Sequence, residues 1–78
     1  MDDREDVAKH ERLAEAAYDA MYEANARSAK VCYEDAALQF TLAIKAANRS
    51  GMTEEALRLK HRMEHVRNVY NHQFRGIG

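Results

Sequence analysis

His61, Glu64 and His65 form the spacing in this chain that is best suited to chemistry, the pattern His-x-x-Glu-His. Residues four apart lie on one face of an α-helix, so the two imidazoles would be placed to hold one zinc ion. A zinc enzyme also needs a third protein ligand and an open coordination position inside a shaped cavity, and the sequence supplies neither. We therefore predict no catalytic residue, no metal site and no cofactor.

Three other side chains invite a functional interpretation. Cys32 is the single cysteine of the sequence, so it cannot form an intramolecular disulfide, and we expect it to pack. Tyr18 and Tyr22 are four residues apart and flank an apolar stripe. Amphipathic tyrosines at this spacing either cover the edge of a bundle or anchor a partner, so we name both as candidate partner-binding residues.

The composition predicts that helices position all of these residues. Proline is absent from the 78 residues, and the three glycines are Gly51, Gly76 and Gly78. Strong helix formers such as Ala, Glu, Lys, Arg, Leu and Met make up much of the rest. A chain of this length forms one domain with a thin core. We predict a single all-α domain over residues 1–78.

Two local signals divide the chain into helices over about residues 3–26, 30–48 and 53–74. Gly51 suits a helix stop and Thr53 suits the N-cap of the next helix. Asn25 and Ser28 are cap-prone residues that indicate an earlier break. The prediction is an antiparallel three-helix bundle. The alternative is a long helical hairpin without the first break, which would be stable as a dimer.

Apolar periodicity gives each predicted helix a buried face. The first would bury Leu13, Ala14, Ala17, Met21 and Ala24, with His10 on the same side; the second Tyr33, Ala36, Ala37, Phe40, Ala43, Ile44 and Ala47; the third Ala56, Leu59, Met63, Val66, Tyr70 and Phe74. The opposite face of the third helix should meet water, and it carries Arg58, His61, His65, Asn68 and His72.

Leu38 and Leu42 do not fit the buried face of the second helix. They project roughly 160° to 200° away from Phe40 at 100° per residue, which gives this helix a second apolar stripe. A lone bundle leaves that stripe in water. Either the two leucines are ordinary exposed residues, or they bind another protein or a second copy of the chain in a homodimer.

The run Tyr33-Glu34-Asp35-Ala36, followed by Phe40 and Ala43, resembles the second helix of tetratricopeptide-type hairpins. With a short loop and a basic third helix, it is also similar to the MIT domain. The resemblance covers about fifteen residues. It implies a helix-in-groove or peptide-binding module without chemistry of its own, and it assigns no binding residue.

The distribution of charge bears on the partner. Residues 1–35 are acidic and residues 36–78 are basic, which we expect to help helices pack antiparallel or copies dock head to tail. The charged N-terminal region contains no apolar run of membrane-spanning length, so we predict a soluble, cytoplasmic protein with no membrane partner.

The sequence thus predicts a small helical protein–protein interaction or regulatory module without catalytic activity. The alternative is a nucleic-acid-associated helical protein that uses Arg58, Arg62 and Arg67 of the basic half. Acids at the start of the third helix, Glu54 and Glu55, would repel a phosphate backbone, so nucleic acid is the weaker of the two hypotheses.

Overall fold

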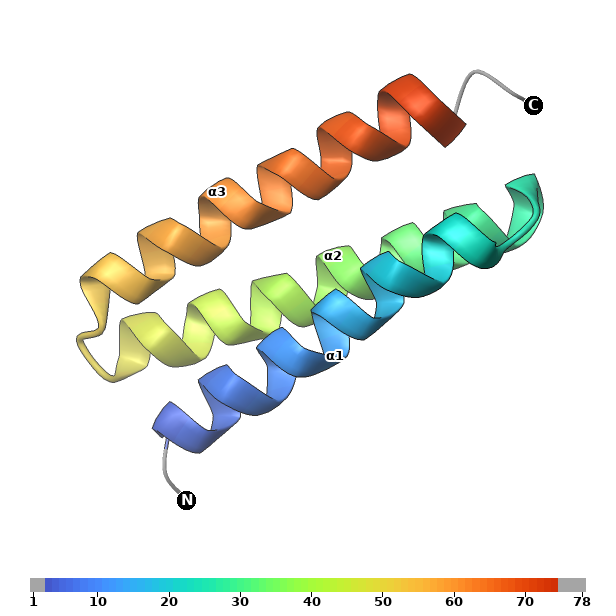
Figure 1. Ribbon diagram of the computed structural model, residues 1–78. Helices are drawn as coiled ribbons and strands as arrows, with labels where there is room; N and C mark the ends of the chain where they lie inside the picture. Colours follow the sequence, from blue (N-terminus) through green and yellow to red (C-terminus); the bar gives the residue numbers. More distant parts are fainter. Residues whose placement is uncertain (1–2, 75–78) are drawn as a thin grey trace.

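The computed structural model describes residues 3–74, which form an antiparallel bundle of α-helices (Figure 1). Helix α1 spans Asp3–Glu23, α2 spans Ala26–Arg49 and α3 spans Thr53–Val69. A π-helical turn, η1, extends α3 over Tyr70–Phe74. The prediction of an all-α three-helix bundle is confirmed for this part of the chain, and the alternative of one unbroken helix before Arg49 is wrong.

Asn25 caps α2 at the break between α1 and α2. Asn25 adopts an extended conformation, and its Oδ1 accepts a hydrogen bond of 2.9 Å from the backbone N–H of Ser28. This N-cap satisfies an N–H group that has no partner inside the helix. Because the cap lies at Asn25, α1 ends at Glu23, before the predicted residue 26, and α2 begins at Ala26, before the predicted residue 30.

The turn between α2 and α3 is a Schellman motif. The Gly51 N–H donates to the Asn48 carbonyl over 3.2 Å, and the Met52 N–H donates to the Ala47 carbonyl over 2.8 Å. Gly51 has a φ of 71°, which a residue without Cβ adopts at little cost, so the predicted stop is confirmed. The predicted cap is wrong: Thr53 is the first residue of α3, and Met52 stands before it without a side-chain cap.

Helix α2 forms the centre of the molecule and packs against both α1 and α3 (Figure 1). Most of the buried residues are alanines, which allow close helix approach, and a few large side chains fill the remaining space. The largest fully buried side chains are Phe40, Met21, Leu59 and Val66. The buried faces predicted for the second and third helices are confirmed, with Tyr33, Ala37, Ile44, Met63, Tyr70 and Phe74 partly buried.

The buried face of α1 differs from the prediction at Leu13, which is 45% exposed. Val7, Ala14 and Met21 repeat every seven residues and define the line that faces α2. Leu13 lies about 100° around the helix from Ala14, so it falls at the edge of this line. Tyr18, rather than Leu13, belongs to the core, since only 8% of its surface is exposed.

None of the helices described over residues 3–74 combines the length and the apolar character needed to cross a membrane.

Candidate interaction surfaces

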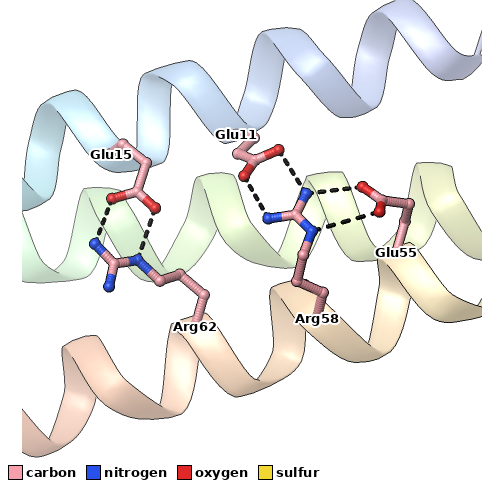
Figure 2. A network of polar contacts seen from close by, with 5 residues as sticks. All are labelled: Glu11, Glu15, Glu55, Arg58 and Arg62. Carbon is pink, nitrogen blue, oxygen red and sulfur yellow. Dashed lines mark hydrogen bonds and ion pairs between the residues drawn. The ribbon is translucent and has the colours of Figure 1, made fainter.

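Helices α1 and α3 meet through long charged side chains, and α2 lies behind them (Figure 2). Arg58 of α3 donates to both carboxylate oxygens of Glu11 in α1, over 2.8 and 2.9 Å. It also binds Glu55, one turn earlier in α3, at 2.8 Å. Hydrogen bonds from Arg58 lower the pKa of Glu55, and those to Glu11 and Glu55 raise the pKa of Arg58.

The same contact recurs one turn further along the two helices. Arg62 donates to Glu15 over 2.8 and 2.9 Å, and its guanidinium carbon lies 5.1 Å from the centre of the Tyr18 ring. The hydrogen bonds to Glu15 raise the pKa of Arg62. We call this surface the α1–α3 face; it consists of Glu11, Glu15, Tyr18, Glu55, Arg58 and Arg62.

These pairs join the acidic and the basic parts of the sequence across two parallel helices. Glu11 and Glu15 follow one another in the same order as Arg58 and Arg62, so α1 and α3 run parallel. The acidic and basic segments therefore attract each other as parallel neighbours on either side of α2. The Arg49–Asp3 pair joins the antiparallel neighbours α2 and α1, which is the orientation that the charge asymmetry predicts.

Of the two candidate tyrosines, Tyr18 belongs to this face and Tyr22 contacts Tyr18, and the two have different environments. Tyr18 is buried, and its hydroxyl lies 2.8 Å from that of Tyr22. Burial, followed by the hydrogen bond with Tyr22, raises the pKa of Tyr18 to about 12. Tyr22 is exposed and packs edge-on against Tyr18 and Phe74. Tyr18 thus has a structural role in the fold, and Tyr22 offers an accessible surface.

Aromatic rings continue from this pair across the end of the bundle. Tyr70 of η1 stacks on Tyr33 of α2 with ring centres 4.4 Å apart, and on Phe74 at 6.4 Å. Beside the first stack is an open hollow of about 480 Å³. Its lining mixes basic, acidic and amide side chains with the two tyrosines, and consists of Lys30, Tyr33, Glu34, Arg67, Tyr70 and Asn71.

A second surface runs along the side of α2 that faces away from α1 and α3. Val31 is 64% exposed and Leu38 is 54% exposed, while Leu42 is partly buried. We call this surface the outer stripe. Its members follow one another at alternating steps of four and three residues: Val31, Asp35, Leu38, Leu42, Lys45 and Arg49.

The charged residues of the outer stripe differ in whether they have an ion-pair partner. Within residues 3–74, neither Asp35 nor Lys45 forms an ion pair. Arg49 reaches Asp3 of α1 at 3.5 Å. The centre of the stripe is thus apolar, with an unpaired acid toward one end and an unpaired base toward the other.

A side-chain hydrogen bond joins α1 and α2. His10 Nδ1 and Gln39 Oε1 are joined by a hydrogen bond of 2.7 Å, which holds the two helices together. Leu13 lies one turn after His10 and is exposed.

The structure brings together Leu38 and Leu42 on one surface, and Tyr18 and Tyr22 on another. It does not bring the two pairs together, because Tyr18 packs toward Arg62 and His65 of α3. Sequence reasoning missed Val31, Asp35 and Lys45 as members of the outer stripe. Their alternating spacing with the leucines was the available signal, since it repeats like a heptad.

The His-x-x-Glu-His motif lies on the outside of α3. His61 and His65 are exposed, and the His65 ring centre is 6.3 Å from that of Tyr18. No group of three or more His, Cys, Asp or Glu side chains arranged to hold a metal ion is found in residues 3–74.

No protein-family model matches the chain, and no curated protein or solved structure matches it.

Proposed function

We propose that this protein is a helical protein–protein interaction module without catalytic activity, acting in the cytoplasm through the outer stripe of α2. The observation that supports the proposal best is the exposure of Val31 and Leu38 at heptad-like spacing. Apolar residues arranged in this way on a helix are typical of surfaces that pack against another helix.

The use of the other sides of α2 supports this choice of surface. Ala36, Phe40 and Ala43 are fully buried by the rest of the bundle. Thr41, on the side of α3, bonds to the Ala37 carbonyl and contacts the sulfur of Met63. The outer stripe lies on the side of α2 opposite Phe40, where the large apolar residues Val31 and Leu38 are exposed beside charged ones.

The nucleic-acid alternative receives less support from the same contacts. It depends on Arg58, Arg62 and Arg67, and the first two bind glutamates of α1. A paired arginine would have to give up its carboxylate before it could bind a phosphate. The resemblance to tetratricopeptide and MIT hairpins agrees with a binding module, and it stays a prediction.

Affinity purification from the native host, with matched variants, tests the proposal. The double variant Leu38→Glu, Leu42→Glu places charges at the centre of the outer stripe. Leu57→Glu is the control, because Leu57 of α3 and Leu38 are both 54% exposed. Proteins that bind through the stripe, including untagged copies of the chain, should be retained by the native protein and by the control and lost with the double variant.

Circular dichroism of all three proteins must show the same helix content for this comparison to hold. Retention of the same proteins by all three would contradict the proposal. Salt-sensitive retention of nucleic acid that is lost in an Arg67→Glu variant would favour the alternative.

A further inference from the structure

The order of side chains along the outer stripe bears on which partner it binds. From its N-terminal end the stripe presents an apolar residue, an acid, two leucines and two bases. Steps of four, three, four, three and four residues keep these side chains on one side of α2 over about 27 Å, at 1.5 Å rise per residue. Any partner must match both the leucines at the centre and the opposite charges around them.

We infer that the partner is a second copy of this chain, whose α2 packs antiparallel against the outer stripe. The two-fold axis crosses the stripe between Leu38 and Leu42. This inference rests on the proposed function, since it names the occupant of the same surface. In this register Leu38 faces Leu42 of the second copy, and Asp35 faces Lys45. Two-fold symmetry repeats each of these contacts.

The outer stripe is complementary to itself in this orientation. The leucines of both copies form one apolar centre, and an Asp35–Lys45 pair flanks it on each side. At the ends, the aliphatic part of Arg49 covers the exposed Val31 of the other copy. Asp35 and Lys45 have no ion-pair partner within residues 3–74, so pairing between copies breaks no existing contact.

A parallel arrangement of the same two helices is disfavoured by the same charges. It would place Asp35 against Asp35 and Lys45 against Lys45. Like charges at facing positions repel each other, so the stripe selects the antiparallel orientation. The contact involves one helix from each copy and is small, so the dimer should exchange with monomer at micromolar concentration.

Light scattering on a size-exclusion column tests the inference with the purified chain. Between about 5 and about 500 μM, the molar mass should rise from 9.0 kDa toward twice that value. A mass that stays at 9.0 kDa up to the highest concentration overturns the inference.

Reversal of the two charges tests the register. Asp35→Lys alone places lysines against lysines at two symmetric positions, and Lys45→Asp alone places aspartates against aspartates. Each should weaken the dimer about ten-fold or more. The double variant Asp35→Lys, Lys45→Asp restores opposite charges and should return the dissociation constant to within about three-fold of the native value.

Glu34→Lys is the matched control, since it makes the same change of net charge on an exposed residue outside the stripe. It should leave the dissociation constant unchanged. If the single reversals leave the dissociation constant unchanged, or if the double variant does not restore the native value, the antiparallel register is overturned.

The outcomes for the partner and for the proposed function can be separated. A chain that stays monomeric, but still retains other proteins through Leu38 and Leu42, overturns the second copy as the partner and leaves the interaction module standing. A monomeric chain that also retains nothing through the stripe overturns both.

Discussion

The α1–α3 face and the outer stripe both carry acidic and basic side chains, but only the outer stripe has aliphatic residues at its centre, and the two surfaces lie on opposite sides of the molecule. On the α1–α3 face, Arg58 and Arg62 each bind a glutamate of α1 through two hydrogen bonds. On the outer stripe, Asp35 and Lys45 point away from both neighbouring helices and find no ion-pair partner in residues 3–74.

This difference indicates how charge is used in a bundle with so small a core. A charged pair that closes the gap between two helices of one chain stabilises the fold, whereas Asp35 and Lys45, which have no ion-pair partner in residues 3–74, are available to a second molecule. Changes to the first surface should therefore alter unfolding without altering mass. Changes to the second should alter mass without altering the fold.

The largest effect should come from Tyr18, the aromatic member of the α1–α3 face. Its pKa is raised to about 12 from an ordinary value of 10.0. Its contribution to stability is therefore complete below about pH 10 and is lost as the pH rises to about 12, by about 2 kcal/mol. Urea unfolding at about pH 9 and about pH 11.5 measures the loss.

Tyr18→Phe provides the comparison, because phenylalanine has no hydroxyl to ionise. The native protein should lose about 2 kcal/mol more than this variant between the two pH values. An equal loss in both proteins would show that other groups account for alkaline unfolding.

A smaller effect is expected from reversing the pair of Glu15 with Arg62. Glu15→Arg or Arg62→Glu alone should lower the free energy of unfolding by about 1 kcal/mol, because both side chains are partly exposed to water. The double reversal should recover part of this loss. Urea unfolding measures the stability, and light scattering measures the mass.

The mass should be the same in all of these variants, unlike in the variants of Asp35 and Lys45. If the Glu15 and Arg62 variants changed the association of the chain, the division between the two surfaces would be wrong.

The smallest effect is a local change in titration at Glu55. Arg58 hydrogen-bonds to this carboxylate and lowers its pKa. Arg58→Met should let the pKa of Glu55 rise toward its ordinary value of 4.5, which carboxyl carbon NMR can follow residue by residue. Arg62→Met is the control, since Arg62 binds Glu15 instead. An unchanged Glu55 titration in the Arg58 variant would contradict the contact.

Much of the fold could be predicted from local signals. Gly51 marks the end of α2 and Asn25 marks its start. The apolar periodicity of α2 and α3 identifies the residues that are buried. The sequence predicts Leu13 in the buried face of α1 and leaves Tyr18 out of it, whereas Leu13 is exposed and Tyr18 is buried. The reason is that the width of a buried stripe depends on the crossing angle of the neighbouring helix. A sequence pattern gives the direction of a side chain from its own helix axis, but it does not give the position of the neighbouring helix.

The candidate surfaces divide in the same way. The sequence by itself determined that Leu38 and Leu42 lie opposite Phe40, since the periodicity of one helix is enough to place them. Only the tertiary structure decided that Glu11 and Glu15 meet Arg58 and Arg62, that Tyr18 is buried beside them, and that Asp35 and Lys45 remain unpaired in residues 3–74. The physical reason is that ion pairs between helices depend on how the helices are placed in space, whereas the faces of a single helix depend on its 3.6-residue turn.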